Sequence, residues 1–133
     1  MDILEGFIKK LEHEINREKN ELTSIEHEIA QLKAKQNSLF KKYSQLEQSE
    51  YTDLLSLSLK NSSMLNILKE IKNIEKQVLR LEEKAEDIRL RIKQKNAEKK
   101  AIKNYQEKIK KEKEIEDIKK ETQLIDEIFN RNS

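Results

Sequence analysis

The sequence contains no cysteine, no proline, no tryptophan and a single glycine among its 133 residues. The absence of cysteine excludes disulfides, thiolate-bound zinc and thiol chemistry. The shortage of glycine and proline argues against phosphate-binding glycine loops and against a multistranded sheet, because both need turn-forming residues. No apolar run reaches the roughly 18 residues of a membrane-spanning helix, and the mixed-charge start MDILEGFIKKLEHE is unlike a secretory signal.

Charge of both signs is abundant instead. Charged residues make up 41% of the chain and hydrophobic residues 35%, and 28 basic side chains nearly cancel 26 acidic ones. A typical globular domain is only about 25% charged. A composition rich in Glu, Lys, Leu and Ile is typical of long helices in a coiled coil.

Apolar residues recur at alternating intervals of four and three along two stretches of equal length. The first stretch runs from Leu4 to Leu46 and the second from Ile67 to Ile109. This alternation is the heptad seam of a coiled coil. Two seams of equal length fit side by side, so we predict an all-α fold in which two long helices form an antiparallel coiled-coil hairpin. The second helix is expected to be longer and to project past the first.

The expected hairpin occupies residues 1–133 as a single unit. We predict a first helix over 3–48, a connecting tip over 49–63 and a second helix over 64–131. Asn61, Ser62 and Ser63 are N-cap residue types and would start the second helix. Four leucines lie in the tip, and they either plug the end of the seam or form an exposed contact patch. These leucines are Leu54, Leu55, Leu57 and Leu59.

Two charged residues interrupt the seams and favour one register. With Leu46 opposite Ile67, Glu18 faces Lys95, whereas sliding the helices by one heptad sets each charge against apolar neighbours. An unpaired charge in a partly buried seam costs a few kcal/mol, so we predict that Glu18 and Lys95 form a register-setting core pair. In the same register Glu14 would lie beside Lys99.

The same residues argue against a parallel homodimer. That arrangement would stack Glu18 on Glu18 and Lys95 on Lys95. Like charges about 4 Å apart repel by roughly 4 kcal/mol at an effective dielectric constant near 20. We therefore expect a monomer.

The repeat breaks after Ile109 and restarts out of phase. The restarted positions are Ile115, Ile118, Thr122, Ile125 and Phe129. Because the first helix offers no partner at this level, residues 110–133 should project as a single helix with an apolar stripe. A lone helix of this length is marginal in water, so this tail either frays, folds back or docks on another protein.

A second line of apolar residues lies off the seam of the second helix at intervals of eleven. Its members are Leu68, Leu79, Leu90 and Ala101. Scattered exposed leucines are normal, and a docking face for a partner is the alternative interpretation.

No constellation of residues suggests catalysis. His13 and His27 lie two heptads apart, on the side opposite the seam, and no nucleophile, base and orienting group can be placed together. We predict no catalytic, cofactor-binding or metal-binding residues and no enzymatic activity. The lysine-rich stretch 93–120 is interpreted as a solvated face or a contact for an acidic protein. Nucleic-acid binding is disfavoured, because Tyr105 is the only nearby aromatic.

The end of the chain carries a resemblance to a known family. Glu121 is followed by Ile125-Asp126-Glu127 and then Arg131, and the second helix contains Ile74-Glu75-Lys76 followed by Val78. With its size, its charge and its missing cysteine, the chain resembles the FliJ and YscO family. These are stalk proteins of flagellar and virulence type III export.

The resemblance implies a cytoplasmic protein at the inner face of an export apparatus. Its terminal end would insert into a hexameric export ATPase, promote ring assembly and stimulate hydrolysis. Another part would contact the cytoplasmic ring of the membrane export gate, and export chaperones are possible further partners. No direct membrane insertion is implied.

Specific residues carry these implied roles. Apolar contacts with the ATPase would come from Ile115, Ile118, Leu124, Ile125, Ile128 and Phe129. Polar contacts inside the ring would come from Asp126, Glu127 and Arg131. The export gate would meet the surface around Ile74 and Leu81, with Leu79 added from the off-seam line, although Ile74 and Leu81 are also seam positions. The alternatives are a structural coiled-coil spacer or tether, and a helical chaperone that uses the tip leucines.

Overall fold

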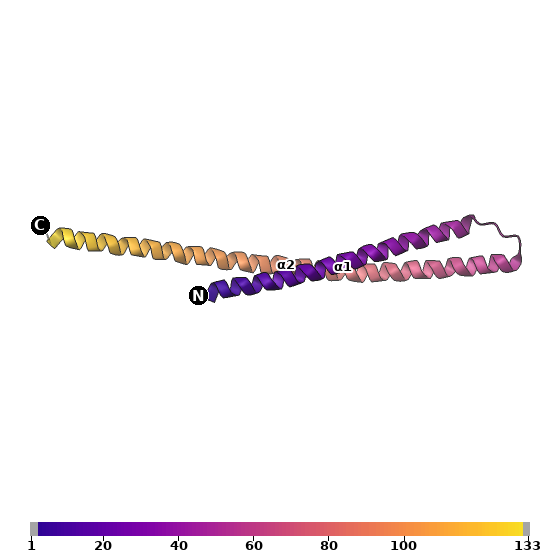
Figure 1. Cartoon of the computed structure of the whole chain (residues 1–133), viewed down its shortest axis with the longest axis horizontal. Helices are drawn as coiled ribbons and strands as arrows, with labels where there is room; N and C mark the ends of the chain where they lie inside the picture. Colours follow the sequence, from indigo (N-terminus) through magenta and orange to yellow (C-terminus); the bar gives the residue numbers. More distant parts are fainter. Residues whose placement is uncertain (1–2, 132–133) are drawn as a thin grey trace. The chain divides into compact units, whose positions relative to one another are not determined.

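The chain folds into two long helices. The computed structural model describes residues 3–131, with α1 over Ile3–Gln48 and α2 over Leu54–Arg131 (Figure 1). Residues 49–53 are the only described residues outside a helix. The predicted all-α class with a longer second helix is therefore confirmed, since α1 has 46 residues and α2 has 78.

Tertiary contacts divide the chain into two units, each made from a piece of both helices. One unit comprises residues 17–92 and includes the connecting loop. The other comprises, within the described chain, residues 3–16 and 93–131.

Residues 17–92 form an antiparallel hairpin with two buried clusters. Leu39 of α1 packs with Ile71, Ile74 and Val78 of α2. Further from the loop, Ile25 packs with Ala85 and Ile88. Counting back from Leu46 opposite Ile67 places Leu39 opposite Ile74 and Ile25 opposite Ile88. The observed clusters therefore confirm the predicted register in this unit.

The predicted seam is the buried line of both helices. All thirteen seam positions of α1 are buried or half-buried, and so are twelve of the thirteen in α2. The exception is Ile109, whose side chain is 42% exposed. Full burial of an isoleucine or leucine contributes about 1.5–3 kcal/mol, so this line supplies most of the stabilisation that holds the helices together.

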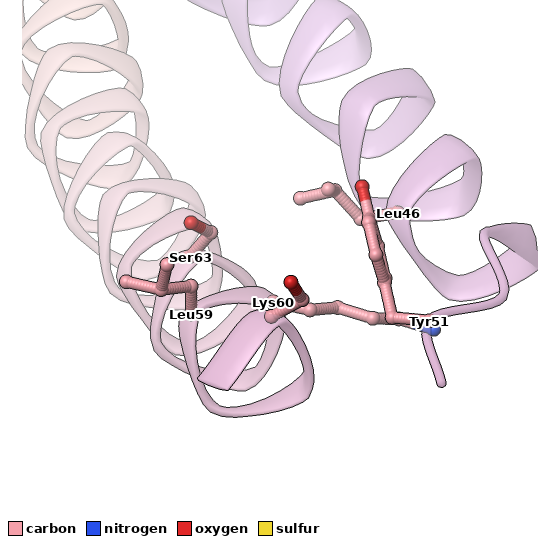
Figure 2. A pocket seen from close by; sticks show the side chains of 6 residues that line it. Leu46, Tyr51, Leu59, Lys60 and Ser63 are labelled. Atoms are coloured by element: carbon pink, nitrogen blue, oxygen red, sulfur yellow. The ribbon is translucent and has the colours of Figure 1, made fainter. Parts of the chain in front are cut away.

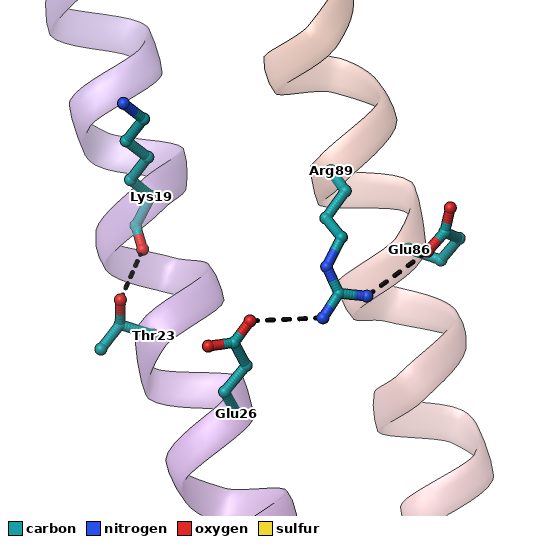
Figure 3. Close-up of polar contacts among 5 residues, drawn as sticks. All are labelled: Lys19, Thr23, Glu26, Glu86 and Arg89. Carbon is teal, nitrogen blue, oxygen red and sulfur yellow. Dashed lines mark hydrogen bonds and ion pairs between the residues drawn. The ribbon is translucent and has the colours of Figure 1, made fainter.

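Ion pairs flank the seam of the hairpin unit. Lys33 of α1 lies 3.4 Å from Glu82 of α2. Arg89 of α2 contacts Glu26 of α1 at 3.2 Å and Glu86 of its own helix at 3.4 Å (Figure 3). The same view shows the Thr23 hydroxyl, which donates to the backbone oxygen of Lys19. Because the paired side chains are half exposed, each pair contributes about 1 kcal/mol at most.

In the other unit, the start of α1 packs against α2 with Ile8 and Ile15 buried. Two ion pairs join the helices there, Glu14 with Lys95 at 3.6 Å and Glu12 with Lys99 at 3.2 Å. The expected pairing of Glu14 with Lys99 was wrong. Lys99 instead bonds to Glu12, which lies half a turn closer to the start of α1, and this leaves Glu14 for Lys95.

The connection between the helices is shorter than predicted. We expected a tip over 49–63 and a helix from 64, but α2 already begins at Leu54. Asp53 occupies the position just before the first residue of α2. Its backbone oxygen accepts a hydrogen bond from the Leu57 N–H at 2.9 Å, and its carboxylate accepts one from the Ser56 hydroxyl at 3.1 Å. Asparagine and serine favour caps but do not interrupt a helix as proline does, so Asn61 and its neighbours lie inside α2.

A lysine from α2 completes the end of α1. The last turn of α1 has no basic residue. Lys60 Nζ donates to the backbone oxygens of Ser49 at 2.6 Å and Glu47 at 3.3 Å. These carbonyls have no partner within the helix, and a cation beside them also complements the negative end of the helix dipole. The contact therefore ties the start of α2 to the end of α1.

Candidate protein-docking surfaces

The predicted tail is a continuous helix without a packing partner among the described residues. α2 runs unbroken to Arg131, and every residue from 107 to 131 is exposed. Within its unit, this end of α2 extends past the start of α1 (Figure 1). The expected projection of 110–133 as a single helix is confirmed for 110–131, and residues 132–133 lie outside the described residues.

The apolar residues of the tail share one broad face. Ile115, Ile118, Ile125 and Phe129, which we name the tail stripe, follow the three-and-four spacing that places residues on one side of a helix. They extend along about 21 Å of the helix axis. Leu124 and Ile128 lie on the adjoining flank by the same periodicity. All six side chains are between 51% and 77% exposed, so they present an apolar surface to solvent.

Polar residues surround the tail stripe on the helix. Asp126 lies beside the stripe, whereas Glu127 and Arg131 lie on the opposite side by the helical periodicity, and all three are exposed. Within the helix, Thr122 donates its hydroxyl to the backbone oxygen of Ile118 at 2.9 Å, and Lys120 pairs with Glu116 at 3.7 Å. These local contacts satisfy Thr122 and Lys120 and leave the apolar side chains uncovered.

The three candidates for the export gate occupy different environments. Ile74 is buried beside Leu39, and Leu81 packs against the cluster of Ile25, Ala85 and Ile88. Leu79 is 54% exposed and is the one of the three that a partner reaches without opening the hairpin. The structure thus gives Ile74 and Leu81 a core role.

The leucines near the loop do not plug the seam. Leu54, Leu55, Leu57 and Leu59 are all exposed, so of the two interpretations left open, the exposed patch is the one that the structure supports. Beside them is a hollow of about 210 Å³ lined by Leu46, Tyr51, Ser56, Leu59, Lys60 and Ser63. Figure 2 shows Lys60 reaching across it from α2 towards the loop, with Tyr51 beside Leu46. Its volume is below the roughly 300 Å³ of typical small-molecule pockets.

The two residues predicted to set the register lie in different units. Glu18 is buried and accepts a hydrogen bond from Arg91 Nε at 2.8 Å. Lys95 is half-buried and pairs with Glu14 at 3.6 Å. Their mutual pairing stays a prediction. Arg91 was not identified from the sequence, although it lies one helical turn before Lys95 and so on the same side of α2.

Among residues 3–131, no three His, Cys, Asp or Glu side chains are grouped so that they would hold a metal ion. Neither α1 nor α2, over the same residues, contains an apolar stretch long enough to cross a membrane. Comparison of the chain with family models, with curated proteins and with solved structures finds no match.

Proposed function

We propose that this protein is a non-enzymatic stalk and coupling factor of a flagellar-type (type III) protein export apparatus. In this role, it works in the cytoplasm at the inner face of the apparatus. The tail of α2 inserts into the hexameric export ATPase, promotes assembly of its ring and stimulates hydrolysis. The hairpin links the ATPase to the cytoplasmic ring of the export gate, and export chaperones are further partners.

The observation that carries the proposal is the exposed tail of α2. The tail has six exposed apolar side chains and no packing partner among the described residues. Such a helix is only marginally stable in water, because helices in proteins are stabilised mainly by packing an apolar face. A hexameric ring with an apolar channel would supply that packing. Asp126 lies beside this face and Glu127 and Arg131 lie on the opposite side of the helix, so that all three would bond to polar groups of a channel wall that surrounds the helix.

The contact with the export gate rests on Leu79. Ile74 and Leu81 form part of the hairpin core, so their side chains are not offered to a partner. Leu79 lies between them in sequence and is exposed. A gate contact on this part of α2 would therefore centre on Leu79.

A second candidate function is a helical chaperone. The exposed leucines at the start of α2 favour it, because an apolar patch at the end of a hairpin would bind unfolded segments. A plain spacer or tether gains no support from either exposed patch, since a spacer needs neither.

The experiment measures hydrolysis and ring assembly by the export ATPase of the same genome. It compares the full chain, a chain lacking residues 110–133, and the triple variant Ile118→Ser, Ile125→Ser, Phe129→Ser. The matched control is Leu54→Ser, Leu55→Ser, Leu59→Ser, which also removes three exposed apolar side chains. We expect stimulation by the full chain and by the control, and basal activity with both tail variants.

Other outcomes separate the candidates. An active ATPase that ignores the full chain would refute the stalk. If the full chain instead suppressed aggregation of an unfolded client, and the loop control lost that effect while the tail variants kept it, the chaperone would be favoured.

A further inference from the structure

α2 carries a second apolar line within the hairpin unit. Leu68, Leu79 and Leu90 are spaced by eleven residues, which is close to three helical turns, so they lie on one face. Their side chains are 40%, 54% and 50% exposed. We name this surface the leucine face. It lies about a third of a turn from the seam, so α1 does not cover it.

Charges on the leucine face are arranged with opposite signs on the two sides of Leu79. Lys72 and Lys76 precede it, and Glu83 and Glu86 follow it. All four side chains are exposed. Lys72 and Glu86 are equally far from Leu79, and Lys76 and Glu83 differ by one residue in their distance from it. A two-fold axis that passes through Leu79, perpendicular to the helix, would therefore place each lysine of one copy near a glutamate of a second copy.

We propose that the leucine face binds a second copy of this chain in an antiparallel, two-fold symmetric pair centred on Leu79. In this pair Leu79 packs on Leu79 of the second copy, and Leu68 packs on its Leu90. Lys72 lies opposite Glu86 of the second copy, and Lys76 lies opposite its Glu83. Each of these contacts occurs twice, because the two copies are equivalent.

The charges select the antiparallel arrangement. A parallel pair would place Lys72 against Lys72 and Glu86 against Glu86, which lie closest to the centre of the face, and like charges that face each other destabilise a pair. The antiparallel pair has one kind of unfavourable contact, which occurs twice: Glu75 of each copy approaches Glu82 of the other. Glu82 already has Lys33 at 3.4 Å, and this cation offsets the repulsion. Lys76 and Glu83 form no ion pair within the described chain and remain available.

The contact between the two copies is small, and the pair is therefore weak. Its leucine contacts are about 16 Å apart along the helix, and the residues between them are charged. Such a surface is at the low end of protein interfaces, and we expect a dissociation constant on the order of 100 µM. The expectation of a monomer concerned the seams, which are filled within one chain. The proposal adds association through another face at higher concentration, and it excludes a simultaneous gate contact at Leu79.

Sedimentation equilibrium of the full chain tests the proposal, up to about 1 mM and at low salt. We expect the average mass to rise from 15.9 kDa towards twice that value. Lys76→Glu and Glu83→Lys should each raise the dissociation constant about tenfold, because each opposes like charges. The double variant restores the opposite signs and should return it to within about threefold of the original. Leu79→Glu, which sets two carboxylates face to face, should abolish the pair.

Lys19→Glu on α1 is the matched control, since Lys19 is exposed and far in sequence from the leucine face. It should leave association unchanged, and circular dichroism should show equal helicity for all variants. A mass of one chain at every concentration would overturn the proposal. So would a dimer that persists in Leu79→Glu, or charge reversals that fail to compensate each other. None of these results bears on stimulation of the ATPase by the tail.

Discussion

Arg91 Nε donates a hydrogen bond to Glu18 Oε1 at 2.8 Å, across the two helices of the hairpin unit. Glu18 occupies a seam position and is buried, whereas the Arg91 side chain is half exposed at the edge of the seam. A long side chain of this kind lays its aliphatic part along apolar surface and keeps its charge near water. The seam therefore accommodates a carboxylate, because a guanidinium reaches it from the flank.

The first prediction concerns this contact. Arg91→Ala should lower the free energy of unfolding by about 1–2 kcal/mol, since a charge-assisted hydrogen bond to a buried carboxylate is lost. The control is Arg80→Ala, which removes an exposed arginine of the same helix for which the described structure shows no ion pair. Urea denaturation followed by circular dichroism measures both. Equal effects would mean that Glu18 gains nothing specific from Arg91.

The second prediction tests the seam. Ile88 is 0% exposed, and Leu90, two residues later on the same helix, is half exposed. Ile88→Ala should cost about 2–4 kcal/mol, because it removes buried methyl groups and leaves a cavity. Leu90→Ala should change stability by less than about 0.5 kcal/mol when measured at micromolar concentration. Similar losses in thermal melts of the two variants would place the buried line elsewhere on α2.

The seam was predictable because heptad spacing is a local property of the sequence. A residue repeated at three and four positions lies on one helical face whatever its partner is. Leu39 and Ile25 were therefore assigned to the core correctly, and the register favoured by Glu18 and Lys95 predicted the pairing of Leu39 with Ile74. Ile109 shows the limit of the pattern, since a seam position at the very end of the paired region is left exposed.

The polar contacts were harder to predict. A heptad pattern assigns a face to each residue, but a lysine or arginine reaches across neighbouring positions in several rotamers. The pairing of Lys99 with Glu12 in place of Glu14, which pairs with Lys95, is of this kind. So is the bond from Lys60 to Ser49, which depends on where the loop ends.

The third prediction separates the observed start of α2 from the expected one. Asp53→Ala should cost about 1 kcal/mol, because Asp53 occupies the N-cap position. Asn61→Ala should instead stabilise the protein by about 0.5 kcal/mol, since Asn61 lies inside the helix and alanine has the higher helix propensity. Both changes are read from urea unfolding curves. A loss of stability in Asn61→Ala would instead support a second helix that begins near residue 61.

The candidate docking surface was predictable in position but not in partner. The break of the repeat after Ile109 and its restart at Ile115 required a helix that α1 does not cover, and the described residues 110–131 are exposed. At the gate candidates, the sequence alone left Ile74 open to two interpretations. Only the packing with Leu39 assigns Ile74 to the core, because burial depends on what the other helix brings to that level.

The fourth prediction concerns the stability of the tail. The triple variant Ile118→Ser, Ile125→Ser, Phe129→Ser should change the free energy of unfolding by less than about 0.5 kcal/mol, because these side chains are exposed and no described residue packs on them.

The matched control to the tail variant replaces three apolar residues at similar spacing in the seam, Ile71→Ser, Ile74→Ser and Val78→Ser. It should unfold the hairpin, since a buried apolar cluster would gain polar groups and lose volume. Thermal melts of both proteins at equal concentration provide the comparison. A clear fall in the melting temperature of the tail variant would show that the tail packs within the protein, and the apolar face would then be no longer available to an ATPase ring.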